Sequence, residues 1–210
     1  MTKLIEVQNI TKEFPGVTAL DDISFDLNEG EVHVLVGENG AGKSTLMKIL
    51  SGVYTPTSGK IIIGGKTYSQ LNPTLSQELG ISIIYQELSV INELSIAENL
   101  FIGRLPTKKV LGAPVVDWKY INTKAADMLQ MVGLKRSPST FVQELSISEK
   151  QLVEIAKALV METRILIMDE PTSSLTPEEI NRLFKIIRNL RDEGVGIIYI
   201  SHKLDEINQV

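Results

Sequence analysis

The sequence contains no cysteine, which excludes a disulfide framework and a thiolate metal site. It also contains no run of the roughly 18 to 20 apolar residues that a membrane-spanning helix needs. Residues 1–7, Met-Thr-Lys-Leu-Ile-Glu-Val, lack the apolar core of a signal peptide. From these absences we expect a protein of the cytoplasm that does not cross a membrane by itself.

An excess of positive charge is missing as well, because the formal net charge is -5. The chain therefore carries no overall electrostatic signature of a nucleic-acid-binding protein. Low-complexity tracts and internal repeats are absent, and the 43% of hydrophobic residues is ordinary for a globular protein. A chain of 210 residues can bury a sizeable core, so we expect one domain, with room for an inserted subdomain.

What the sequence does contain is a phosphate-binding loop at residues 37–45, which read Gly-Glu-Asn-Gly-Ala-Gly-Lys-Ser-Thr. They match the pattern G-x-x-x-x-G-K-[ST], whose glycines let successive backbone N–H groups and a helix N-terminus face one anion. A simple glycine turn is the alternative, but a chance match occurs in only about one such chain in a hundred. An apolar run precedes the loop and apolar residues at helical spacing follow it, which favours nucleotide binding.

The loop supplies the candidate nucleotide-binding residues, which are Gly37, Glu38, Asn39, Gly40, Ala41, Gly42, Lys43, Ser44 and Thr45. Lys43 is expected to reach the β- and γ-phosphates, and Ser44 to offer its hydroxyl to Mg²⁺. Thr45 is expected to donate to the α-phosphate side. A nucleotide with Mg²⁺ is therefore the predicted ligand.

Hydrophobic patterns predict the fold class. Near-continuous apolar runs, typical of strands buried on both faces of a parallel sheet, occur at 81–85, 164–168 and 195–200. Alternating patterns, typical of antiparallel strands, occur within 1–30 and at 60–63 and 66–68. We therefore expect an α/β fold with a mostly parallel core sheet, an antiparallel β side sheet and an inserted helical subdomain. The core would comprise residues 1–86 and 159–210, and the helical subdomain residues 87–158.

Two carboxylates, Asp169 and Glu170, directly follow the apolar run 165–168, at the kind of strand end where open α/β sheets bind ligands. Asp169 is expected to hold Mg²⁺, directly or through water, and Glu170 to accept a proton from attacking water. Taken alone, these residues read better as a strand end with solvated charges. The phosphate loop reverses that preference.

Further features follow the phosphate loop in the order Gln86, Leu145-Ser146, Asp169-Glu170 and His202. With them the chain resembles the nucleotide-binding subunit of an ABC transporter over nearly all of its length. The resemblance implies the P-loop NTPase fold of ABC ATPases, with ATP and Mg²⁺ as cofactors. It also implies that Gln86 helps to order Mg²⁺ and the attacking water, that His202 contacts the γ-phosphate, and that Phe14 stacks on adenine. By themselves Gln86 and His202 would be ordinary residues at strand ends, and Phe14 would be a core residue.

One segment departs from the family pattern. Residues 145–151 read Leu-Ser-Ile-Ser-Glu-Lys-Gln, whereas the family signature is Leu-Ser-Gly-Gly-Gln. In the family, Ser146 and the helix after it cap the γ-phosphate of an ATP that a second nucleotide-binding domain holds. The bulk of Ile147 and Ser148 and the negative charge of Glu149 are expected to weaken that contact.

These departures, together with residues 83–89 and 168–176, resemble the first domain of bacterial monosaccharide importers of the allose, ribose and galactose type. The resemblance implies a second nucleotide-binding domain, in the same native chain or in a dimer partner, and a native chain that continues past Val210. It also implies membrane permease subunits as partners, and a periplasmic sugar-binding protein that acts indirectly. The implied location is peripheral, on the cytoplasmic face of the inner membrane.

The expected function is ATP binding and hydrolysis that energise import of a monosaccharide through a membrane permease. An ABC-type ATPase acting on nucleic acid or ribosomes would share every phosphate-site motif, but no basic arm or zinc-type cysteine is present. A nucleotide-binding regulator without turnover would explain the altered signature, but Glu170 is intact. We therefore expect an ATPase with no nucleic-acid partner.

Overall fold

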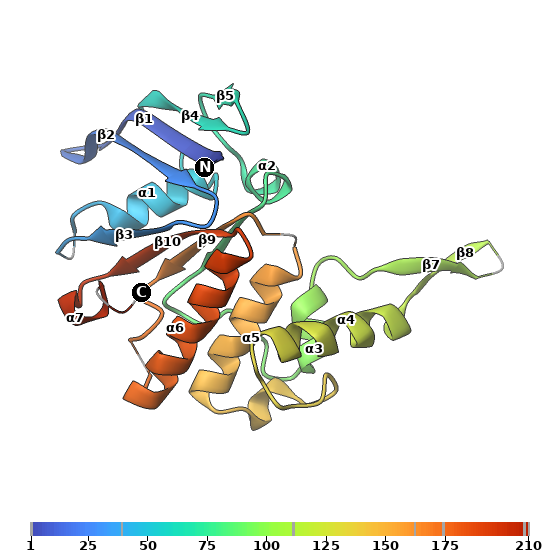
Figure 1. Cartoon of the computed structure of the whole chain (residues 1–210). Helices are drawn as coiled ribbons and strands as arrows, with labels where there is room; N and C mark the ends of the chain where they lie inside the picture. Colours follow the sequence, from blue (N-terminus) through green and yellow to red (C-terminus); the bar gives the residue numbers. More distant parts are fainter. Residues whose placement is uncertain are drawn as a thin grey trace.

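Two four-stranded sheets lie on either side of helix α1 (Lys43–Leu50) in the computed structural model (Figure 1). The structure describes residues 2–38, 40–110, 112–161, 163–173, 175–207 and 209. Leu46, Met47, Ile49 and Leu50 of α1 are buried, and they belong to a cluster with apolar residues of both sheets. Helix α1 is therefore the middle layer between the two sheets, and packing against both of them holds it in place.

The parallel sheet has the strand order β3 (Val32–Val36), β10 (Gly196–Ser201), β9 (Ile165–Asp169), β6 (Ile81–Ile84). All of its neighbouring strands are parallel, as the apolar runs predict. Every residue of β10 is buried, because α1 covers one face of the sheet and helices cover the other. The carboxyl ends of β3, β9 and β10 consequently meet at one edge of the sheet.

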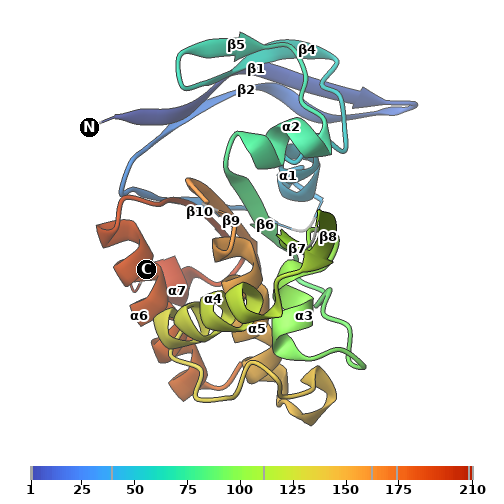
Figure 2. The same ribbon diagram turned by 90° about the vertical axis from the view of Figure 1, so that its right-hand side faces the viewer.

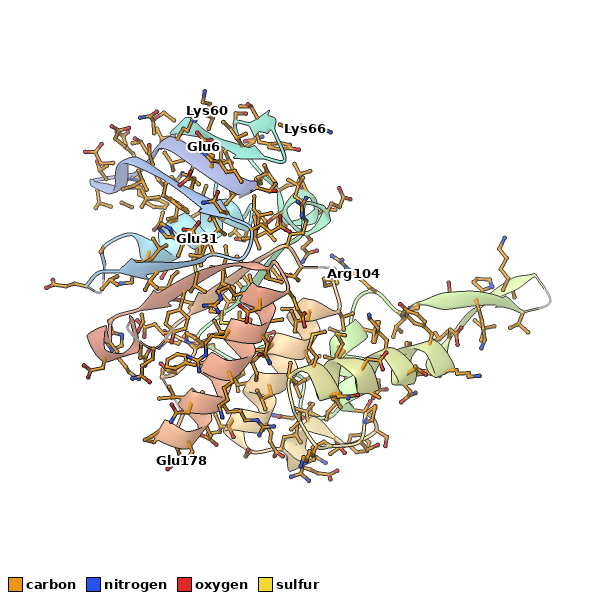
Figure 3. All side chains as sticks on the ribbon, in the orientation of Figure 1. Glu6, Glu31, Lys60, Lys66, Arg104 and Glu178 are labelled. Atoms are coloured by element: carbon orange, nitrogen blue, oxygen red, sulfur yellow. The ribbon has the colours of Figure 1, made fainter. Side chains whose placement is uncertain are left out.

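The antiparallel sheet has the order β2 (Val17–Asn28), β1 (Lys3–Phe14), β4 (Ser58–Ile63), β5 (Lys66–Tyr68). Its inner face is apolar, with Ile5 and Val7 buried against α1. Figure 3 shows Glu6, Lys60 and Lys66 on the outer side of this sheet, as the alternating pattern requires. The predicted side sheet is confirmed.

Between β6 and β9 the chain forms α3 (Ile96–Phe101), the hairpin β7 (Thr107–Val110) and β8 (Ala113–Val116), α4 (Trp118–Met131), a 3₁₀ turn (Val142–Glu144) and α5 (Ile147–Leu159). Asp117 caps α4 as predicted, since its carboxylate accepts from the N–H of Tyr120. The hairpin was not predicted, because its strands are short and almost fully exposed and therefore do not alternate between buried and exposed residues. It projects away from the rest of the molecule (Figures 1 and 2).

Helix α6 (Pro177–Asp192) covers the parallel sheet beside α5, and its predicted capping box of Thr176 and Glu179 is present. Two shorter helices were not expected: α2 (Pro73–Glu78) after the side sheet and α7 (Leu204–Ile207) after β10. Neither is long enough to show a helical period in the sequence. The predicted class is otherwise confirmed: an α/β fold with a parallel core sheet, an antiparallel side sheet and helices inserted between two core strands.

Candidate functional site

Three sequence-predicted segments meet at the carboxyl edge of the parallel sheet. Val36, which precedes the phosphate loop, pairs with Ser201. Ile200 pairs with Asp169 in the next ladder. Because parallel strands in this register end side by side, the loop, the Asp169-Glu170 pair and His202 emerge next to one another. Residues more than 160 positions apart in the sequence thus form one site.

Helix α1 begins without a side-chain cap. Its N-cap residue is Gly42, whereas the five helices α2 to α6 start at a side-chain oxygen that accepts from a first-turn N–H, on Asn72, Ser95, Asp117, Ser146 and Thr176. The first N–H groups of a helix have no partner inside the helix, and its dipole favours an anion there. The start of α1 is therefore suited to a bound phosphate in a way that the other five helix starts are not.

The glycines of the loop are required by its shape. Gly42 has a φ of 85°, and a Cβ placed there would lie 2.3 Å from the carbonyl oxygen of Ala19 on β2. Gly40 has a φ of 88°, which side-chain-bearing residues rarely adopt. The loop is a cradle that larger residues would fill or distort, and this fits the phosphate chain of a nucleotide.

Lys43 lies across the mouth of this cradle. Its Nζ donates to the carbonyl oxygens of Gly37, at 2.5 Å, and Glu38, at 2.9 Å. Ser44 is exposed and Thr45 is half-buried at the start of α1. The cation and the exposed hydroxyl fit the predicted phosphate and Mg²⁺ contacts. Asn39, also predicted to bind nucleotide, lies outside the described residues.

Asp169 faces the same space. Burial raises the pKa of its carboxyl, the charge of Glu170 raises it further, and the ammonium of Lys43 lowers it. An ionised Asp169 is therefore costly here unless a cation balances it. The described residues include no cluster of three His, Asp or Glu side chains that could hold a metal alone. The carboxylate of Asp169 and the hydroxyl of Ser44 are oxygen donors of the kind that Mg²⁺ prefers, so these residues fit the predicted ion.

Glu170 and His202 are in direct contact. Nδ1 of His202 lies 2.9 Å from Oε1 of Glu170. The side chain of Glu170 is 15% exposed and that of His202 is 51% exposed, so the pair opens to solvent from the histidine side. Glu170 has a φ of 45°, a conformation that costs free energy for a residue with a side chain, and its N–H donates to the carbonyl of Ile200 at 3.0 Å.

Three predicted residues do not join this group. Gln86 is exposed just after β6, and Phe14 is half-buried with its ring edge-on to Tyr54 at 5.5 Å. Ser146 caps α5, accepting from the N–H of Glu149 at 3.3 Å. In the described part of the chain no hydrogen bond links Gln86 or Ser146 to the phosphate loop. Their roles stay predictions that depend on bound nucleotide or a second domain.

Two buried polar residues near the site were not anticipated. Gln151 of α5 donates to the carbonyl of Pro171, directly after Glu170. Glu206 of α7 accepts from Thr172, Tyr199 and Ser201. Nothing in the sequence distinguishes Gln151 and Glu206 from exposed residues of the same type, because their partners are brought to them only by the fold.

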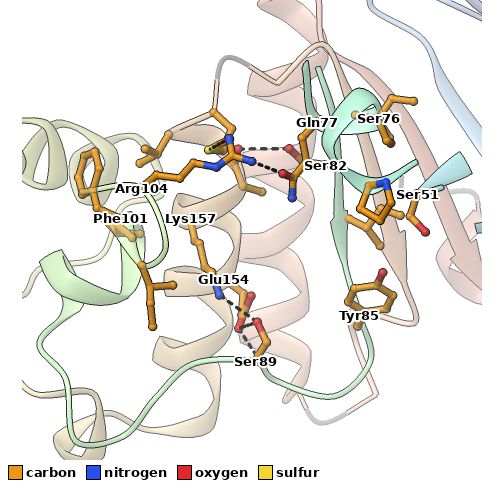
Figure 4. A pocket seen from close by; sticks show the side chains of 18 of the residues that line it. Ser51, Ser76, Gln77, Ser82, Tyr85, Ser89, Phe101, Arg104, Glu154 and Lys157 are labelled. Atoms are coloured by element: carbon orange, nitrogen blue, oxygen red, sulfur yellow. Dashed lines mark hydrogen bonds between the residues drawn. The ribbon is translucent and has the colours of Figure 1, made fainter. Parts of the chain in front are cut away.

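A cavity of about 310 Å³ lies away from the phosphate loop, between α2, β6, α3 and α5 (Figure 4). Arg104 bridges it, donating to the side chain of Gln77 on α2 and to Sδ of Met161 at 3.3 Å. Deeper inside, Glu154 accepts from the N–H and hydroxyl of Ser89 at 2.7 and 2.8 Å. These two hydrogen bonds tie the segment after Gln86 to helix α5.

Comparison with known proteins was consistent across sequence and structure. A family model described as ABC transporter matches residues 20–173. The chain is 52% identical over 209 residues to the D-allose import ATP-binding protein AlsA of Escherichia coli, and 51% identical over 205 residues to the ribose import ATP-binding protein RbsA 2 of Streptomyces coelicolor. These matches cover 100% and 98% of the chain but only 41% and 39% of the relatives, so the chain spans about two-fifths of their length.

Among solved structures, an ATP-binding cassette of an ABC transporter in its ADP conformation superposes with a TM-score of 0.88 at 28% identity. That match covers 100% of this chain and 85% of the other. A nucleotide-free ATP-binding cassette from an ABC transporter superposes with a TM-score of 0.87 at 27% identity over 100% of this chain and 85% of the other.

In the described residues, no helix is both long and apolar enough to span a membrane.

Proposed function

Because the chain belongs to the ABC transporter family, we propose that it binds and hydrolyses Mg·ATP to energise import of a monosaccharide through a membrane permease. The observation that carries the proposal is the meeting of the uncapped start of α1 with the Glu170–His202 pair at one edge of the sheet. The first element binds phosphate, and the second can move a proton.

The residues divide the work of phosphoryl transfer. Lys43 and the first N–H groups of α1 orient the phosphates and balance their charge. Asp169 and Ser44 would hold Mg²⁺, which would supply positive charge to offset that of the phosphates. Glu170 accepts the proton of the attacking water, and His202 holds the carboxylate in line. Gln86 orders the same water, and Phe14 supports the adenine.

The altered signature at residues 145–151 implies that the two ATP sites between this domain and a second one would differ in hydrolysis rate. Ser146 and the start of α5 would face the ATP of a second nucleotide-binding domain, in the same native chain or in a dimer partner. The intact phosphate loop of this chain would face the signature of that domain. Hydrolysis would then occur mainly on the ATP that Lys43 holds.

The cavity beside Gln86 is the proposed docking site for the permease. Its rim carries exposed apolar side chains, including Val53, Tyr85 and Ile102, which are 54%, 43% and 41% exposed. Ser89 and Glu154 connect this rim to α5, and so to the helix that carries the signature. A periplasmic sugar-binding protein would act only through the permease. The chain would sit on the cytoplasmic face of the inner membrane.

The names of the relatives favour this function over the alternatives. The two relatives named above are called import ATP-binding proteins, for allose and for ribose. A net charge of -5 does not favour a nucleic-acid partner. The contact of Glu170 with His202 at 2.9 Å supports turnover over a purely regulatory role.

The proposal is tested by titrating Mg·ATP into the protein and its Lys43→Ala variant. A charge-assisted contact contributes about 1.5–3 kcal/mol, so the dissociation constant should rise roughly 10- to 150-fold. Lys48→Ala is the matched control, because Lys48 is on the same helix but lies over the ring of Tyr54 at 5.3 Å. Equal affinity of Lys43→Ala and the unaltered protein for Mg·ATP would contradict the proposal.

A further inference from the structure

Glu206 is a buried residue whose two carboxylate oxygens both accept hydrogen bonds. It is 5% exposed, and its Oε1 accepts from the hydroxyl of Thr172 at 2.6 Å. Its Oε2 accepts from the hydroxyls of Tyr199, at 2.8 Å, and Ser201, at 2.9 Å. The ammonium of Lys203 lies 3.3 Å from Oε1. The side chain of Glu206, on the short helix α7, thus interacts with three hydroxyl groups and one ammonium group.

The carboxylate stays ionised at neutral pH. Burial raises the pKa of Glu206, but the hydrogen bonds from Thr172, Tyr199 and Ser201 and the charge of Lys203 outweigh burial, so the pKa lies below its usual value. Hydrogen bonds to a charged group are about twice as strong as neutral ones. Glu206 therefore holds its partners firmly, and removing it would leave buried donors unsatisfied.

The partners of Glu206 come from the two segments that carry the catalytic pair. Thr172 follows Glu170 by two residues, on the segment after β9. Tyr199 and Ser201 lie in the second half of β10, and His202 directly follows Ser201. Figure 1 shows α7 beside that end of β10. Glu206 consequently ties the two segments together a few residues from the point where Glu170 meets His202.

We propose that Glu206 is a positioning residue, which fixes the segment of His202 against the segment of Glu170 so that their 2.9 Å contact forms. The inference rests on the proposed ATPase function and deepens it. Glu206 does not touch the reacting atoms; it acts through Thr172 on one side and through Tyr199 and Ser201 on the other. The backbone supports the same arrangement, because the N–H of Lys203 donates to the hydroxyl of Ser201 at 3.0 Å.

The first test measures ATP turnover by the complete transporter that contains Glu206→Gln. The amide keeps the size of the side chain but loses the charge and one acceptor atom. We expect kcat to fall about 10- to 100-fold, as for a small misplacement of catalytic groups. The KM for ATP and the dissociation constant of Mg·ATP should change less than about twofold, because the phosphate loop is untouched. Asp205→Asn removes a neighbouring exposed charge and is the matched control.

A double-mutant cycle separates positioning from a general loss of stability. If Glu206 acts through His202, Glu206→Gln should lower kcat by less than about twofold in a His202→Ala background. Independent losses that multiply would overturn the proposal, and so would an unchanged kcat of Glu206→Gln alone. If Glu206→Gln does not fold, Tyr199→Phe and Thr172→Val, which each delete one bond to the carboxylate, replace it in the same cycle. Turnover that is insensitive to His202→Ala would instead overturn the proposed function, and this assignment with it.

Discussion

Arg136 holds the carboxylate of Glu149 by two hydrogen bonds, from Nε to Oε1 at 2.7 Å and from Nη2 to Oε2 at 3.3 Å. The guanidinium lowers the pKa of Glu149, and the N–H of Ser146 also donates to Oε2 at 2.9 Å. The sequence predicts that Glu149 repels a phosphate at the start of α5. Because the carboxylate is paired, that repulsion is weaker than the sequence suggests, and the exposed side chain of Ile147 becomes the larger obstacle.

The 210-residue chain alone is expected to hydrolyse ATP slowly or not at all, since a homodimer would pair each intact loop with an altered signature. The double substitution Ile147→Gly and Ser148→Gly should raise phosphate release more than Glu149→Gln does. The side chains of Ile147 and Ser148 obstruct the contact sterically, whereas the charge of Glu149 is already paired with Arg136. Adding Glu170→Gln to the double glycine variant should abolish the gain. Vigorous release by the unaltered chain at low micromolar concentration would contradict the assignment of unequal sites.

Glu170→Gln should retain Mg·ATP binding while kcat of the complete transporter falls by about 10² to 10⁴, the usual effect of removing a general base. Binding should survive because the proposed phosphate contacts come from Lys43 and the start of α1 rather than from Glu170. Glu178→Gln, far from the site at the start of α6, is the control (Figure 3). Parallel loss of binding and turnover in Glu170→Gln would point to a structural role for the carboxylate.

Asp169→Asn should raise the thermal midpoint of the nucleotide-free protein at pH 7. Burial raises the pKa of Asp169 in the folded state, so folding favours the protonated carboxyl and the ionised form lowers stability above that pKa. The difference between the two proteins should shrink as the pH falls through the raised pKa, because the carboxyl of the unaltered protein then protonates. Calorimetry across this range measures the effect, and a lower midpoint for Asp169→Asn at pH 7 would refute it.

Ile102→Glu and Val53→Glu should weaken association with the permease, since each places a charge on the apolar rim of the cavity. Met131→Glu is the matched control, because Met131 is also 41% exposed but lies on α4 and does not line this cavity. Co-purification of the nucleotide-binding protein with its permease provides the readout. Mg·ATP affinity should stay unchanged in all three variants. Equal loss of the permease with Met131→Glu would argue against this docking site.

Local features were predictable because their causes lie within a few residues. The capping box of Thr176 and Glu179 and the cap at Asp117 need only neighbours three residues away. The phosphate loop is local too, since glycine spacing alone sets its backbone. The hairpin β7–β8 was missed because both of its strands are exposed and so leave no hydrophobic period.

The sequence by itself determined the strands of the two large sheets, the position of the glycine-rich loop and the residue types that are proposed to bind phosphate or move a proton. Only the tertiary structure decided how they meet. Glu170 contacts His202 across 32 residues, and Thr172 reaches Glu206 across 34, because parallel strands β9 and β10 end side by side. Whether a charged residue such as Glu149 or Glu206 is free or paired depends on side chains that the fold brings in from elsewhere, and no local pattern records that.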